Sequence, residues 1–141
     1  TPKTHRRQRQ MCIRDSQKTA AAGETIVMPP GQPHIHPWNA GDTEMVYRQI
    51  NKFEQPSPQA VQDVIGVFAT LFGMTREGKL DKRGLPKNPL QFAATLRTLT
   101  KYDGYDASVP IPAQKILAAT LGRLAEAIGY KAVYPQYLNG G

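Results

Sequence analysis

The chain has few of the features that form disulfide frameworks, zinc sites or membrane-spanning segments. It contains one cysteine, Cys12, among 141 residues, so an internal disulfide framework is excluded. One cysteine and three histidines also cannot form a Cys-rich zinc module, which needs about four such ligands. No apolar run approaches the roughly 20 residues that span a bilayer, and the first residues lack the apolar run of a secretory signal. The sequence therefore predicts a cytoplasmic protein with no transmembrane segment.

The positive charge of the chain is concentrated near its beginning. The formal net charge is +7, and residues 1–22 carry six basic residues against one acidic residue, which is +5. The rest of the chain carries only +2. A basic arm is typical of nucleic-acid tails, but this one has no aromatic residue that would stack on a base. We therefore expect no nucleic-acid partner, and we predict that residues 1–22 form an unstructured tail.

The middle of this tail suggests an origin for it. Residues 8–16, Gln-Arg-Gln-Met-Cys-Ile-Arg-Asp-Ser, look like translated sequencing-adaptor read-through, a contaminant of open reading frames assembled from short reads. Two alternatives stay open, a solvated native extension and a nucleic-acid arm. On the first interpretation the tail is artefactual, and the chain is a fragment that lacks its true upstream half.

Residues 23–55 show β-like patterning. Residues 25–28 are rich in β-branched and apolar side chains and are followed by Pro29 and Pro30, which end a strand. Residues 44–50 alternate in polarity with a period of two, as a half-buried strand does. Between them, residues 39–42 have turn chemistry. The pattern predicts two short strands joined by a rigid, proline-rich connection.

This connection resembles a known motif. Gly23, Pro29, Gly31, His34 and Asn39 are similar to the second motif of the cupin superfamily, which reads glycine, five residues, proline, one, glycine, two, histidine, three, asparagine. The match holds through His34, after which this chain has one residue more before Asn39. The resemblance implies that His34 is a ligand of Mn, Fe, Ni or Zn and that Asn39 fixes its turn.

The resemblance is incomplete as a metal site. In cupins the other ligands come from an earlier motif of the HxH…E type, and no such motif precedes His34 in this chain. His36 lies two residues further on and would project to the same side of an extended segment, so it is a second candidate ligand. The alternative for both histidines is a structural or surface role. We expect the parent protein to bind a divalent metal and this chain alone to hold none.

Residues 56–141 have the periodicity of helices. Ser57-Pro58 and Asn88-Pro89 are N-cap and first-turn pairs, and Pro112 opens a third run that closes at Gly129. Each run has an apolar stripe at helical spacing, which we expect to be buried. The stripes consist of Val61, Val64, Ile65, Phe68, Leu71 and Phe72, then Phe92, Leu96 and Leu99, then Leu117, Leu121, Leu124 and Ile128. Gly73 is expected to end the first helix, and Tyr130, Tyr134 and Tyr137 are expected to belong to a C-terminal packing segment.

The connection between the first two helices is rich in charge. Residues 74–87 contain five basic and two acidic residues. One interpretation is an anion-binding loop or a lid over a pocket. The other interpretation is a solvated connection that contains glycines. It is favoured because no phosphate-binding glycine pattern is present.

The helical half extends the resemblance, because residues 68–79, 84–86, 89–91 and 129–137 look like the C-terminal extension of small bacterial cupin-domain proteins. The implied fold class is α+β, a partial cupin β-sandwich or barrel of few strands followed by about three α-helices. Its parts are a tail (1–22), the end of a cupin β-domain (23–55) and a helical extension (56–141).

The resemblance implies a parent that binds a divalent metal and a small organic ligand, as an oxygenase or isomerase. The alternatives are a non-catalytic cupin that binds or senses a small molecule, and a helical module for oligomerisation or a membrane surface. Whether the protein is an enzyme and whether it is a homo-oligomer stay open.

Overall fold

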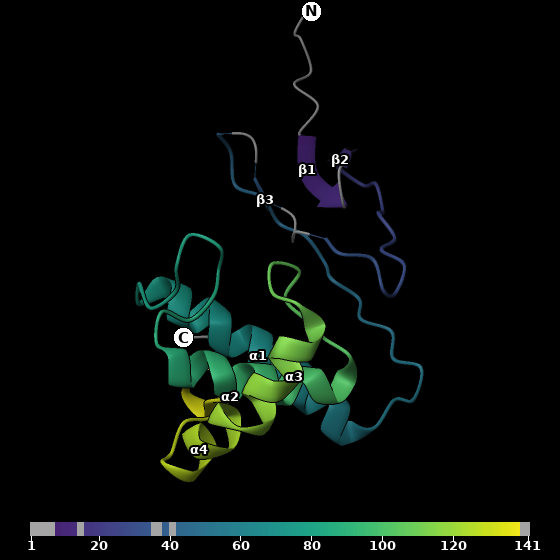
Figure 1. Cartoon of the computed structure of the whole chain (residues 1–141). Helices are drawn as coiled ribbons and strands as arrows, with labels where there is room; N and C mark the ends of the chain where they lie inside the picture. The colour runs from purple at the N-terminus through teal and green to yellow at the C-terminus, as the bar shows by residue number, and fades with distance from the viewer. Residues whose placement is uncertain (1–7, 14–15, 35–37, 40–41, 139–141) are drawn as a thin grey trace, which may run out of the picture. The chain divides into compact units, whose positions relative to one another are not determined.

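The chain divides into two compact units, residues Thr1–Asn51 and Lys52–Gly141 (Figure 1). The structure, a computed structural model, describes residues 8–13, 16–34, 38–39 and 42–138. Over these residues no helix is long and apolar enough to cross a membrane, as the composition predicts.

The first unit contains a small antiparallel sheet. Strands β1 (Gln8–Ile13) and β2 (Ser16–Ala21) pair along their whole length, and β3 (Trp38–Asn39) pairs with the other edge of β1, so the strand order is β2-β1-β3. The prediction of an unstructured tail is therefore wrong for the residues of β1 and β2. The physical reason is that ladder hydrogen bonds join backbone groups, so a hairpin can form without apolar alternation of its side chains.

The predicted cupin β-sandwich is wrong. Its two expected strands, 25–28 and 44–50, have no regular secondary structure. The part of the chain that the structure describes holds one sheet, and no second sheet faces it. A strand is stabilised by a partner ladder and by a face that it buries, whereas Val27, Val46 and Ile50 are all more than 70% exposed. The fold class is accordingly not a partial cupin α+β fold, and the protein is mainly helical.

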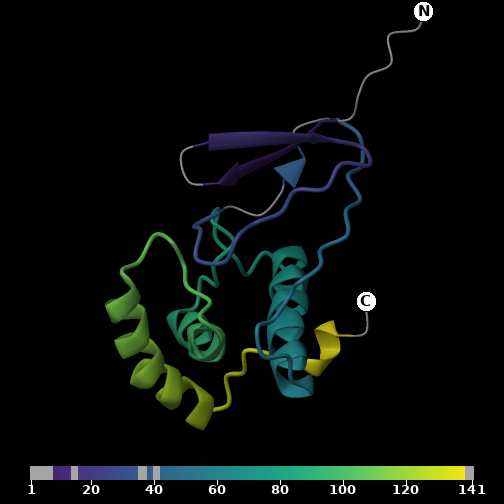
Figure 2. The same cartoon turned by 90° about the vertical axis from the view of Figure 1, so that its right-hand side faces the viewer.

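The second unit is a bundle of short helices around α2. The helices are α1 (Pro58–Arg76), α2 (Pro89–Leu99), α3 (Ile111–Ala119) and α4 (Leu121–Ala127), with 3₁₀ turns η1 (Thr100–Tyr102) and η2 (Pro135–Tyr137). Figure 2 shows α2 between α1 on one side and the α3–α4 pair on the other, and α2 contacts all three. Ala93, Ala94 and Leu96 of α2 are buried and form the centre of the core.

The helix starts are those the sequence predicts. The Ser57 hydroxyl accepts the backbone N–H of Ala60 at 3.0 Å, and the Asn88 side chain accepts those of Leu90 and Gln91 at 2.9 and 3.3 Å. The third predicted helix is divided at Thr120, whose backbone leaves the helical region (φ −104°, ψ −80°). Its first half, α3, packs beside α2 and its second half, α4, continues along α2.

The predicted apolar stripes describe the packing of α1 and α4 poorly, whereas Leu96 of the α2 stripe is buried as predicted. On α1 the buried positions are mostly small, among them Ala60, Gly66 and Gly73, whereas Ile65 and Phe72 of the predicted stripe are largely exposed. On α4 the buried residues are Gly122 and Ala125, and Leu124 and Ile128 are exposed. Small residues let neighbouring backbones approach closely, and tight packing is favourable because it multiplies dispersion contacts. Close approach therefore decides which helix faces are buried.

Candidate functional site

Of the two predicted metal ligands, His34 and His36, the structure describes only His34. His34 is exposed, and its ring Nδ1 lies 3.0 Å from the backbone carbonyl of Gln32, only two residues earlier. His36 lies outside the described residues. Among the residues that are described, no group of three or more His, Cys, Asp or Glu side chains could hold a metal ion. Since a metal site needs three or four converging ligands, the described residues form no metal centre, and the roles of His34 and His36 as ligands in the parent protein stay a prediction.

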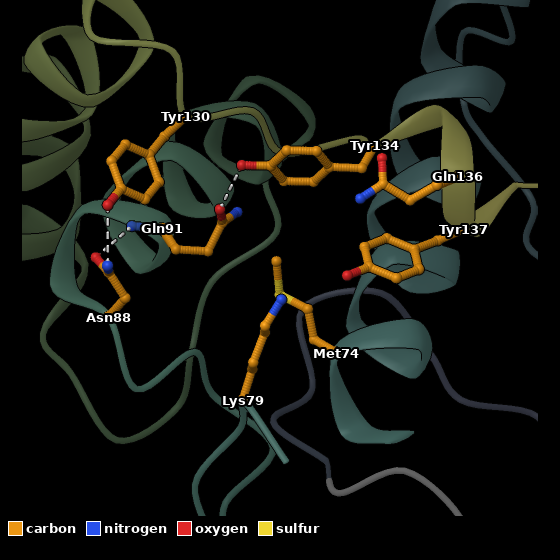
Figure 3. A pocket seen from close by; sticks show the side chains of 8 residues that line it. All are labelled: Met74, Lys79, Asn88, Gln91, Tyr130, Tyr134, Gln136 and Tyr137. Carbon is orange, nitrogen blue, oxygen red and sulfur yellow. Dashed lines mark hydrogen bonds between the residues drawn. The ribbon is translucent and has the colours of Figure 1, made fainter. Parts of the chain in front are cut away.

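The candidate site lies instead in the helical unit. A pocket of about 270 Å³ opens between the end of α1, the start of α2 and the C-terminal segment (Figure 3). Its walls come from parts of the chain that are far apart in sequence. The lining residues are Met74, Lys79, Asn88, Gln91, Tyr130, Tyr134, Gln136 and Tyr137. Such a volume is close to the lower end of the range for ligand pockets in proteins, about 300–1,000 Å³.

One wall of the pocket is built on the first turn of α2. The Asn88 side chain caps this helix with its oxygen, and its Nδ2 donates to the Tyr130 hydroxyl at 3.0 Å. The cap therefore fixes the position of the tyrosine as well as the start of the helix. Tyr130 is in place because Gly129, with φ +102°, turns the chain back after α4.

The back wall is a partly buried hydrogen-bond network around the buried Gln91 side chain. The Tyr134 hydroxyl donates to Gln91 Oε1 at 2.9 Å and accepts the backbone N–H of Lys131 at 3.2 Å. Gln91 Nε2 donates to the Lys131 carbonyl at 2.7 Å, and the backbone N–H of Tyr134 donates to the Thr70 hydroxyl at 3.0 Å. These bonds tie the C-terminal segment to both α1 and α2, so the wall is rigid.

The third wall carries the charge of the site. Lys79 Nζ lies 2.5 Å from Glu77 Oε2, and the Tyr137 hydroxyl donates to the same oxygen at 2.8 Å. The hydrogen bond with Glu77 raises the pKa of Lys79, and the bonds from Lys79 and Tyr137 lower the pKa of Glu77. Both groups are therefore ionised at neutral pH. In Figure 3 the Lys79 and Met74 side chains point toward the middle of the ring of lining residues.

The sequence indicated some of these residues but not their common site. Tyr130, Tyr134 and Tyr137 belong to the C-terminal packing segment, as expected, and the structure adds that all three line a pocket. Lys79 comes from the basic connection, for which a pocket lid was the less favoured interpretation. Met74, Asn88, Gln91 and Gln136 were not singled out as site residues. The available signal was the spacing of three tyrosines downstream of a glycine, which alone does not identify what they face.

Comparisons of this chain with protein-family models, with curated proteins and with solved structures found no match. The family resemblance of residues 23–39 and 68–137 therefore stays a prediction, and the site is interpreted from its own geometry.

Proposed function

We propose that the helical unit binds a small organic molecule in the pocket between α1, α2 and the C-terminal segment. The observation that carries this is the composition of its walls: tyrosine rings and the buried Met74 side chain, interrupted by one ammonium and a few polar groups. Mostly apolar walls with a few placed polar groups are typical of small-molecule sites. The wall residues are also held by hydrogen bonds within the protein, so little order has to be gained on binding.

Binding without catalysis is the function that these groups support best. A general base must lose its proton near neutral pH, but the raised pKa of Lys79 keeps the ammonium protonated. The Tyr134 and Tyr137 hydroxyls already donate to Gln91 and Glu77. The charged and phenolic groups are thus arranged to hold a ligand in place.

The proposal is tested with a set of small aromatic and aliphatic fragments, each present as an acid and as its amide, observed by saturation-transfer NMR. Several fragments are expected to bind, and those that bind are expected to raise the thermal midpoint of the protein. Gln136 lies exposed at the pocket, so Gln136→Trp should block entry without disturbing the core. Lys82→Trp is the matched control, because Lys82 is also exposed but does not line the pocket. Absence of binding, or binding unchanged by Gln136→Trp, would contradict the proposal.

A second candidate function is self-association through α1. Val61, Ile65 and Phe72 lie within about 40° of one another around the helix, over roughly three turns, and are 42%, 46% and 57% exposed. An exposed apolar stripe of this kind is typical of an interaction surface. Sedimentation equilibrium tests it: Ile65→Lys should shift an oligomer toward monomer, whereas Gln62→Lys, on another exposed position of α1, should not. A wild-type monomer at high concentration would exclude this candidate.

A further inference from the structure

We infer that the ligand of this pocket is a small monocarboxylate with an apolar body. The inference rests on the proposed function and adds the chemical class of the ligand. Three features carry it: unused hydrogen-bond donors at the site, the positive charge of the neighbouring loop, and the apolar walls.

The polar groups at the pocket have more donors than acceptors to offer. The Lys79 ammonium has three N–H donors, and its bond with Glu77 accounts for one. The Tyr130 hydroxyl accepts from Asn88, and within the described part of the chain its own O–H has no protein acceptor. On the back wall Gln91 Oε1 already accepts from Tyr134, and the exposed Gln136 amide brings one acceptor oxygen beside two N–H donors. A ligand that brings acceptors and no donors matches this arrangement, and a carboxylate is acceptor-only.

The charge of the neighbouring loop favours a ligand that is an anion over a neutral ligand that only accepts hydrogen bonds. Residues 74–87 run past the pocket from the end of α1 to the cap of α2 and carry a net charge of +3. Two of their five cations are paired, Lys79 with Glu77 and Arg83 with Asp81. The ion pair at the pocket is itself neutral, so the excess charge comes from the rest of the loop. A positive potential of this kind attracts a small anion and weakens as salt is added.

The remaining walls favour an apolar body of limited size. The Met74 side chain is buried, and the rings of Tyr134 and Tyr137 meet edge to face with centroids 6.2 Å apart. Aromatic rings and a thioether contact hydrocarbon groups favourably. With one ammonium at its edge and a volume of about 270 Å³, the pocket suits a single negative charge on a short aromatic or branched aliphatic body.

Glu77 provides a sharp test, because it competes with a ligand carboxylate for Lys79. Glu77→Gln keeps an oxygen that accepts from Tyr137 and removes the competing charge. This variant should bind acids several-fold more tightly than the wild type, whereas a cationic ligand would be bound more weakly.

The experiment uses benzoate, cyclohexanecarboxylate and 3-methylbutanoate, each beside its amide, titrated into the full chain and followed by NMR. Each acid should bind at least about tenfold more tightly than its amide. Lys79→Met should remove this preference, and Lys82→Met should reduce it only slightly, because it removes one charge of the loop and no donor of the pocket. Circular dichroism of both variants checks that they fold.

The outcomes separate the inference from the proposed function. Amides that bind as well as the acids, or an acid preference that survives Lys79→Met, would overturn the monocarboxylate while leaving a small-molecule pocket in place. If neither acids nor amides bind, in these pairs or anywhere in the fragment set, the proposed function fails and the inference fails with it.

Discussion

The ring of Tyr137 lies against Gly73 and fills the space that a side chain at position 73 would occupy. A Cβ added to Gly73 would be 2.1 Å from Cδ1 of that ring, far inside van der Waals contact. This close approach seats η2 on α1, and it places the Tyr137 hydroxyl beside Glu77 at the edge of the pocket. The glycine is therefore a packing residue of the site, within α1, and the prediction that it ends the helix is wrong.

Gly73→Ala should destabilise the helical unit by about 1–3 kcal/mol, because the Tyr137 ring must move. In a helix without such a neighbour the same change would stabilise by about 0.5–1 kcal/mol. Urea unfolding of the wild type and the variant measures the difference.

The control for this prediction is the same substitution in a Tyr137→Ala background. There Gly73→Ala should be neutral or stabilising, since the ring is gone. Equal destabilisation in both backgrounds would show that contact with Tyr137 is not the cause.

The features that the sequence predicted correctly are local ones. Ser57 and Asn88 cap their helices through bonds to residues two or three positions away, so the signal and the structure lie in the same short segment. The apolar stripes of α1 and α4 failed because burial depends on which face approaches a neighbour. On α1 that face contains Gly66, where a Cβ would lie 2.6 Å from a methyl carbon of Val133. A residue 67 positions away therefore decides the burial of this face, and periodicity does not contain that information.

The candidate site was hard to predict for the same reason. Its polar contacts join residues about 40 to 60 positions apart, such as Asn88 with Tyr130 and Glu77 with Tyr137. The motif around His34 is a local pattern, and the described residues hold no group of ligands with which it could form a metal site. The spacing of the tyrosines predicted that they pack in the C-terminal segment. It did not predict the pocket that they line.

Gln91→Leu should destabilise the protein by about 1–3 kcal/mol, although the two side chains have similar volumes. The substitution removes the donor of the Lys131 carbonyl and the acceptor of the Tyr134 hydroxyl at partly buried positions, and polar groups that lose their partners away from water are costly. Chemical denaturation checks this, with Gln59→Leu on the exposed start of α1 as the control. In a Tyr134→Phe background the cost of Gln91→Leu should be smaller, and strictly additive costs would contradict the network.

The loop between α1 and α2 should lose stability in acid through Asp81. The backbone N–H groups of Leu85 and Arg83 donate to its carboxylate at 2.9 and 2.8 Å, and these bonds, that of Leu85 first, lower its pKa below the usual 3.8. An acid whose pKa is lower in the folded state stabilises the fold above its unfolded pKa, and this stabilisation is lost as the pH falls through the folded pKa. Asp81→Asn should therefore reduce the difference in unfolding free energy between neutral pH and pH values below 3.8.

The matched control for Asp81 is Glu54→Gln, an exposed carboxylate before α1. It should leave the acid dependence nearly unchanged. Glu77, whose pKa is lowered by Lys79, contributes in the same direction, so Asp81→Asn should reduce the dependence without abolishing it. An acid profile identical to that of the wild type would show that the Asp81 bonds do not stabilise the folded loop.

Tyr102 should ionise above the usual tyrosine range. Its hydroxyl donates to Asp63 Oδ2 of α1 at 2.6 Å, and this bond, with some burial, raises the pKa of Tyr102 above 10.0. The protonated hydroxyl therefore stabilises the fold at and below the unfolded pKa, and the stabilisation is lost as the pH rises through the folded value. A titration of phenolate absorbance should show a component above pH 10.0 that Tyr102→Phe removes and that Tyr47→Phe, in the first unit, leaves in place.

Asp63→Asn keeps an oxygen acceptor but removes the charge, so it should return this component toward 10.0. If Tyr102→Phe instead removes a component at or below 10.0, the bond to Asp63 does not hold the proton on the hydroxyl.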